Sequence, residues 1–187
     1  MILQLKIQIE SISKPPVWRK VLVPANFSFA RLHLIIQNAF GWGNYHLYMF
    51  SPKGYGSYPI IGLPNEEWDD EETYNSEKVK LSDILTKKGM TFKYIYDFGD
   101  DWIHKITVED IIVDKRATKA SLIGGKGACP PEDCGGVWGY YQLLETIDNP
   151  SHPDYSDMRE WLGLEEEDVW DRSAFDKEQA EEDVAAV

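Results

Sequence analysis

The residues best suited to chemistry lie in one short stretch, Tyr94 to His104. A strand-type run ends at Asp97 and another begins at Trp102, and the glycine between them is typical of a hairpin turn. This hairpin would pair Asp97 with Trp102 and place Asp97 and His104 diagonally on one face of a sheet. A carboxylate beside an imidazole suits a catalytic acid–base pair or two ligands of a metal ion.

The same pair has a purely structural interpretation. Ile106 and Val108 share the alternation of His104, so the histidine would lie on an apolar face and be satisfied by Asp97. The sequence leaves both interpretations open. Under the first, His46 joins Asp97 and His104 as the third candidate ligand, and the implied cofactor is a divalent metal.

A second candidate segment runs from Cys129 to Gly136. Its Cys-x4-Cys pattern is at most half a zinc site, which histidines would have to complete, and the alternatives are two packed thiols or one reactive thiol. Gly135 and Gly136 allow a close backbone approach and open a predicted helix, whose free amides could hold an anion or be capped by Glu132 or Asp133. The ligand-binding candidates in both segments and nearby are His46, Tyr96, Asp100, Trp102, Cys129, Glu132, Asp133, Gly135 and Gly136.

The composition limits the classes of function. The 187 residues are 43% hydrophobic, enough to bury one core. Thirty-two acidic against nineteen basic residues give a net charge of −13, which argues against non-specific binding to nucleic acid or to an anionic membrane. Two cysteines, a strand pattern directly after Met1 and no apolar run long enough to span a bilayer favour a cytoplasmic protein.

The patterning predicts one α+β domain over residues 1–175, followed by an acidic, frayed tail over 176–187 that has helical character. We expect a mostly antiparallel sheet of about five strands, packed against two main helices. The strands are predicted at residues 3–9, 17–23, 45–51, 92–97 and 102–113, and the two helices at 28–40 and 137–147. Residues 115–127 are interpreted as a basic, Gly-rich link that resembles a phosphate loop only superficially.

The region from Pro52 to Lys80 is rich in Gly, Pro, Tyr and acidic residues, and it predicts a long surface loop. Its acidic run, Glu66 to Glu72, either stays solvated or binds a divalent cation, although it matches no EF-hand spacing.

Several motifs together resemble a known family. They are Pro16-Val-Trp-Arg19, Leu32-His33 through Phe40-Gly-Trp42, His46-Leu-Tyr-Met-Phe50, Tyr96-Asp-Phe-Gly-Asp-Asp-Trp-Ile-His104, and Cys129 to Gly136 followed by Gly139-Tyr140. The combination resembles the plasmid pRiA4b-type open-reading-frame-three family, also labelled insertion-element passenger proteins of the TnpR type. The resemblance implies an α+β fold and an association with mobile elements, and it assigns no reaction. The chain has few arginines and an acidic tail, so the label does not imply a serine recombinase.

Three hypotheses of function follow. The first is a binding module that holds a protein partner or a small ligand with residues 52–80 and 129–136, using exposed aromatic side chains as contact area. The second is a metal-dependent hydrolase in which His46, Asp97 and His104 hold the metal and Glu132 or Asp133 assists. The third is an accessory role in transposition without direct DNA catalysis.

Overall fold

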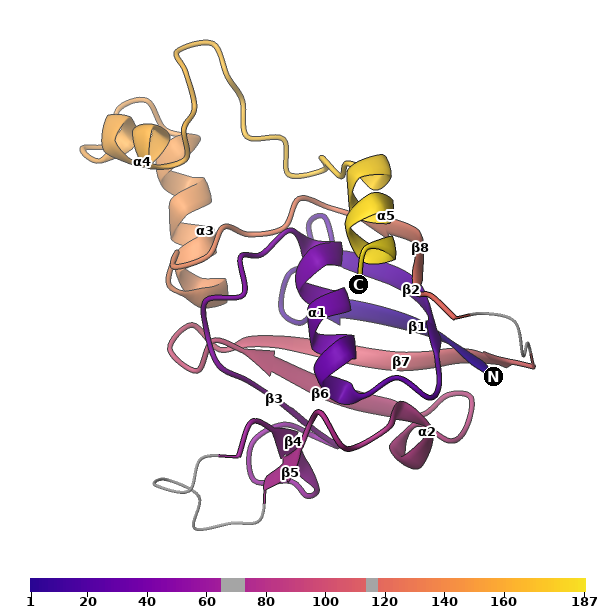
Figure 1. Ribbon diagram of the computed structural model, residues 1–187. Helices are drawn as coiled ribbons and strands as arrows, with labels where there is room; N and C mark the ends of the chain where they lie inside the picture. The colour runs from indigo at the N-terminus through magenta and orange to yellow at the C-terminus, as the bar shows by residue number, and fades with distance from the viewer. Residues whose placement is uncertain (65–72, 114–117) are drawn as a thin grey trace.

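The computed structural model describes residues 1–64, 73–113 and 118–187 (Figure 1). The strands are β1 Ile2–Ile9, β2 Trp18–Pro24, β3 Tyr48–Ser51, β4 Ile60–Gly62, β5 Thr73–Asn75, β6 Thr91–Tyr96, β7 Trp102–Ile112 and β8 Ser121–Lys126. They form one sheet in the order β5-β4-β3-β6-β7-β1-β2-β8, in which only the β4–β5 pair is parallel. The helices are α1 Phe29–Phe40, α2 Leu81–Ile84, α3 Gly136–Ile147, α4 Tyr155–Trp161 and α5 Lys177–Ala185. The predicted α+β class is confirmed.

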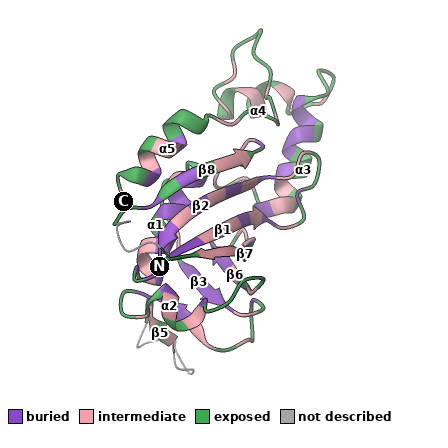
Figure 2. Cartoon of the chain, turned by 90° about the vertical axis from the view of Figure 1, so that its right-hand side faces the viewer, coloured by how far each residue is buried: buried purple, intermediate pink, exposed green. Residues whose placement is uncertain are grey.

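Helix α1 is the central element of the core. The Ser28 hydroxyl accepts the N–H of Arg31 at 3.2 Å, and Gly41 ends the helix with a φ of 81°. Leu32 and Ile36 are fully buried against the sheet. Helices α1 and α5 lie on the same face of the sheet (Figure 1), while buried and intermediate residues alternate along β1 and β2 (Figure 2). This alternation is expected of strands with one covered face and one polar face.

The described residues form eight strands rather than the expected five, because three short strands carry weak sequence signals. Strand β8 lies inside the segment that we interpreted as a Gly-rich link, and it pairs with β2. One of its two glycines is required by packing, because a Cβ on Gly125 would lie 2.4 Å from the Phe175 ring. Strands β4 and β5 border the acidic run Glu66 to Glu72, which lies outside the described residues. None of the described helices is long and apolar enough to cross a membrane.

Residues 176–187, expected to be a frayed tail, form a docked helix in the structure. Helix α5 packs against α1 and β8, with Val184 fully buried. Arg31 donates through its Nε to the carbonyl oxygen of Val187 at 3.0 Å, and Asn38 donates to that of Asp183 at 2.8 Å. The acidic residues lie on the outer face of α5, so a strongly polar sequence still presents one apolar stripe to the core.

The docking of α5 can be tested with Val184→Asp. Because Val184 is fully buried, an unpaired carboxylate there is expected to cost more than about 2 kcal/mol in urea-induced unfolding and to expose α5 to protease. Ala185→Asp places the same charge on the exposed neighbouring position and is expected to change little. Equal stability of the two variants would restore the frayed-tail prediction.

Candidate functional site

The turn between β6 and β7 differs from the predicted hairpin. Tyr96 pairs with Trp102, so the expected pairing of Asp97 with Trp102 is wrong by one residue. Residues 97–101 form a longer loop, closed by a hydrogen bond from the Asp101 N–H to the Asp97 carbonyl at 2.7 Å. Asp97 and Asp101, not the glycine, take positive φ angles of 57° and 53°. Asp97 therefore leaves the strand and lies in the loop, away from the strand position that His104 occupies.

His104 is fully buried among aromatic rings. Phe40 and Trp42 meet the imidazole edge-on, with ring centroids 5.1 and 5.2 Å away. Its Nδ1 donates to the Trp102 carbonyl at 2.9 Å, which leaves Nε2 as an unprotonated nitrogen with no hydrogen-bond partner among the described residues. Burial lowers the pKa of His104 to about 3, against the opposing effect of that hydrogen bond. This geometry favours the core-histidine interpretation of His104 over a role as a metal ligand.

Three chain segments meet beyond the ends of β6 and β7. We call them the loop junction: residues 42–47, 97–101 and 129–136. Glu132 ties the junction together, because its Oε1 accepts from the Tyr96 hydroxyl at 2.5 Å and its Oε2 from the Gly43 N–H at 2.7 Å. The Tyr96 hydroxyl also accepts the N–H of Tyr45 at 3.0 Å. Burial and then the bond to Glu132 raise the pKa of Tyr96, so this hydroxyl keeps its proton and remains a donor.

At the loop junction, His46, Asp97 and Asp133 bring three ligand-type atoms together. The Nε2 of His46 lies 3.2 Å from Asp133 Oδ1 and 3.7 Å from Asp97 Oδ2, and the three ligand atoms lie within 4.8 Å of one another. Nε2 is shielded from solvent and meets neither carboxylate in a hydrogen-bonding geometry. The Asp97 side chain is 12% exposed and that of Asp133 is 68% exposed, so the cluster opens to solvent at Asp133.

These distances suit a shared divalent ion. Two ligand atoms that each lie about 2.1 Å from zinc are about 3.0–3.4 Å apart, close to the spacing observed around His46. One imidazole nitrogen with two carboxylate oxygens is a ligand set for zinc or manganese. Residues 42–52, 94–104 and 127–158 contain no Lys or Arg, so these segments supply no basic side chain to offset the two carboxylates. Asp133 thus joins His46 and Asp97 in the cluster, where the sequence predicted His104.

A ring of hydrogen bonds positions the 42–47 segment that carries His46. Gln37 donates to the Tyr94 hydroxyl at 2.9 Å, and that hydroxyl lies 2.8 Å from Nδ1 of His33. The Nε2 of His33 lies 2.6 Å from the Asn44 side-chain oxygen, and the Asn44 N–H donates to Gln37 at 3.1 Å. Burial lowers the pKa of His33 to about 4, so the neutral ring donates to Asn44 and accepts from Tyr94.

The start of α3 is held by an aspartate from another loop. The Gly135 N–H donates to Asp100 Oδ2 at 3.1 Å, so Asp100 occupies the place considered for an anion or for Glu132 or Asp133. Gly136 has a φ of 66°, and a Cβ there would lie 2.1 Å from the Asp100 carbonyl oxygen. The close backbone approach expected of this glycine pair is therefore made to the 97–101 loop.

The remaining candidates have structural surroundings. Trp102 is fully buried and packs on Trp42 with ring centroids 5.7 Å apart. Cys129 and Cys134 are free and partly buried. Burial raises the pKa of both thiols, that of Cys134 to about 12, which disfavours the thiolate that metal binding or nucleophilic attack needs. Packed thiols fit this setting best among the alternatives that the sequence left open.

Sequence reasoning missed the place of Asp133 in the cluster with His46 and Asp97, and it missed the hydrogen bond between Tyr96 and Glu132. Asp133 has a φ of 58°, and this backbone conformation aims its carboxylate at the 42–47 segment, which no periodicity reveals. One available signal was that the three segments of the junction contain no Lys or Arg, whereas residues 97–101 and 129–136 together carry five acidic residues.

The fold and this junction define a class: an α+β protein with an acidic loop cluster at one end of a mostly antiparallel sheet. A family model described as plasmid pRiA4b ORF-3-like protein matches residues 1–179, and the chain belongs to that family, as the motifs predicted. The uncharacterised protein y4hQ of Sinorhizobium fredii is 35% identical over 185 residues, which cover 99% of this chain and 93% of that protein. The fold is also similar to the crystal structure of MM3350, a protein of unknown function from Methanosarcina mazei Go1, with a TM-score of 0.78 and 35% sequence identity. The match covers 95% of this chain and 96% of the MM3350 chain.

Proposed function

We propose that this protein is a binding module whose ligand site is the loop junction, with a divalent metal ion held by His46, Asp97 and Asp133. The observation that carries the proposal is the convergence of these three side chains from three separate segments, within 4.8 Å. The hydrogen bonds of Glu132 to Tyr96 and Gly43 fix the segments relative to one another before any ligand arrives. Such preorganisation reduces the entropy lost on binding.

Exposed aromatic side chains around the junction support a protein or small-molecule ligand in addition to the ion. Tyr45 precedes His46 and is 81% exposed, and Phe98 follows Asp97 in the turn. Tyr55 donates to Asp101 at 2.5 Å and lies beside Phe98, with ring centroids 6.4 Å apart. Exposed aromatic groups beside a charged centre supply the contact area typical of binding sites.

Metal binding is tested by elemental analysis of untagged protein purified without chelator, followed by calorimetric titration with Zn²⁺ and Mn²⁺. We expect near-stoichiometric metal, and we expect His46→Ala and Asp133→Asn each to weaken binding by at least about 100-fold, because each removes a direct ligand. His104→Phe is expected to leave the metal affinity unchanged, since His104 lies in the core.

His152→Ala provides the matched control, because His152 also lies near an aspartate, with its Nδ1 3.9 Å from Asp154. Equal metal binding by His46→Ala and His152→Ala would overturn the proposal. A titration without binding would do the same and would leave His46 as an imidazole that lies near two carboxylates without a shared ion.

A metal-dependent hydrolase is the second candidate function. It is favoured by one observation: three protein ligands, one of them largely exposed, leave coordination positions open, as in catalytic zinc sites. A metal in such a site lowers the pKa of bound water. Turnover of nitrophenyl ester or phosphate substrates that disappears with His46→Ala would support this function. An accessory role in transposition stays a prediction from the family resemblance.

A further inference from the structure

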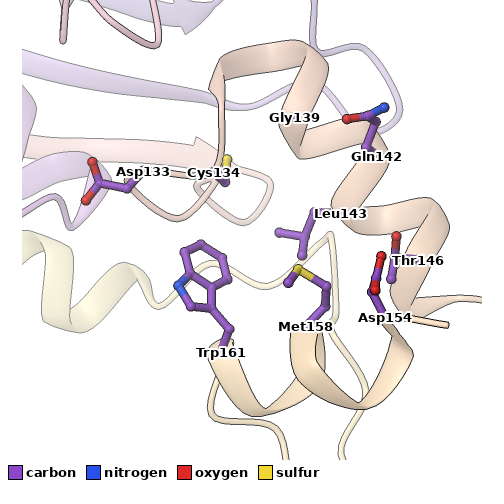
Figure 3. A pocket seen from close by; sticks show the side chains of 9 residues that line it. All are labelled: Asp133, Cys134, Gly139, Gln142, Leu143, Thr146, Asp154, Met158 and Trp161. Carbon is purple, nitrogen blue, oxygen red and sulfur yellow. The ribbon is translucent and has the colours of Figure 1, made fainter. Parts of the chain in front are cut away.

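A cavity of about 410 Å³ lies between α3 and α4, next to the loop junction (Figure 3). This volume is within the range of small-molecule sites. Its walls come from both helices and from the end of the Cys129–Gly136 segment. The carboxylate of Asp133 points away from the cavity in Figure 3, consistent with its approach to His46, so the cavity and the cluster around His46 are neighbouring but separate features.

The lining combines an apolar floor with oxygen acceptors. Leu143, Met158 and Trp161 face one another across the middle of the cavity (Figure 3), and Trp161 is 48% exposed. Asp154 and Thr146 both line the end of the cavity that Figure 3 draws at its right. Gln142, from the turn of α3 before Thr146, also lines the cavity. One carboxylate, one hydroxyl and one amide oxygen are acceptors for hydrogen-bond donors, and a Trp face attracts cations.

Among the described residues, no lysine or arginine forms an ion pair with the Asp154 carboxylate. Residues 127–158 contain no Lys or Arg. The nearest basic residue in sequence, Arg159, donates to the carbonyl oxygens of Glu165, Glu166 and Asp168. His152 lies 3.9 Å from the carboxylate, but its Nδ1 accepts the N–H of Asp154 at 3.1 Å and so does not carry a proton there. The acceptor end of the cavity is therefore negative and uncompensated within this region.

We infer that the cavity binds a primary alkylammonium group attached to an aliphatic chain. The ammonium carries three N–H donors, and the lining offers acceptors on Asp154 and Thr146, with a further one on Gln142 along the α3 wall. The aliphatic chain of the ligand would pack on Leu143, Met158 and Trp161. The same chemistry is offered by a free diamine and by a lysine side chain of a partner protein. This site does not depend on the metal at His46, so either proposal can fail without the other.

The test uses protein with ¹³C-labelled methionine methyl groups, titrated at 150 mM salt with cadaverine and, separately, with Nα-acetyl-lysine methylamide. We expect the Met158 methyl resonance to shift with saturation while the other three methionines stay unchanged. Asp154→Asn is expected to weaken binding by about tenfold or more, because it removes the charged acceptor. Asp157→Asn, the matched control, removes an exposed carboxylate of α4 that does not line the cavity and should bind normally.

The two ligands separate the possible sources. Tighter binding of cadaverine indicates a free amine, and tighter binding of the lysine derivative indicates a partner's lysine. The inference is overturned if neither ligand shifts Met158, if 1-pentanol binds as well as cadaverine, or if the Asp154 and Asp157 variants lose affinity equally.

Discussion

Replacing Gly136 by alanine is expected to lower the free energy of unfolding by roughly 2–4 kcal/mol and to weaken metal binding at the loop junction. The added Cβ would lie 2.1 Å from the carbonyl oxygen of Asp100, and the φ of 66° is itself strained for any residue with a Cβ. The obstacle is backbone, not a flexible side chain, so either the start of α3 or the 97–101 loop must move. Such a shift separates Asp97 from Asp133, because Asp97 lies three residues before Asp100 and Asp133 lies three residues before Gly136.

Gly163→Ala isolates the effect of the close contact. Gly163 has nearly the same φ, 67°, but no atom lies within 4 Å of its added Cβ. This variant is expected to cost only about 1 kcal/mol and to leave metal binding unchanged. Urea unfolding and metal titration of both variants provide the measurement. If they lose equal stability and bind metal equally, the contact between Gly136 and Asp100 does not hold the junction together.

The sequence predicted those parts of the fold whose signals are local and periodic. Strand β1 alternates cleanly, and α1 begins at a serine cap and ends at a glycine. Strand β8 was missed because two glycines interrupt its pattern, and the packing of Phe175 and Arg19 over Gly125 explains one of them. The docking of α5 was missed because its few apolar residues, such as Val184, are outweighed by acidic neighbours.

The candidate site could be predicted only in part, because its geometry depends on backbone conformations that leave the regular pattern. The sequence did identify the residues involved, because His46, Asp97 and Asp133 were all candidate site residues. Their meeting depends on positive φ angles at Asp97 and Asp133, which end the strand alternation used to orient Asp97. The alternation did hold for His104, and for that reason it points into the core with Trp102 rather than toward the junction.

The buried histidines predict a strong acid dependence of stability. Burial lowers the pKa of His33 to about 4, despite its bond to Asn44, and that of His104 to about 3, whereas histidines of the unfolded chain titrate near 6.5. Between these values the unfolded state binds more protons than the folded state, so the free energy of unfolding falls as the pH drops below 6.5. Each histidine contributes up to about 1.4 kcal/mol per pH unit in this window.

His104→Phe is expected to remove about half of this pH dependence, because phenylalanine keeps the ring packing against Phe40 and Trp42 but binds no proton. Urea unfolding at pH 7, 6 and 5 measures the slope directly, and His152→Gln, which changes a half-exposed histidine outside the core, is the comparison variant. An unchanged slope in His104→Phe would show that His104 is not held neutral. The pH dependence that remains in this variant belongs to His33. In the folded protein the Tyr94 hydroxyl donates to Nδ1 of His33, and protonation of that nitrogen would place two donors against each other. Since this ring of bonds holds Asn44 two residues before His46, acid is expected to loosen the loop junction together with the core.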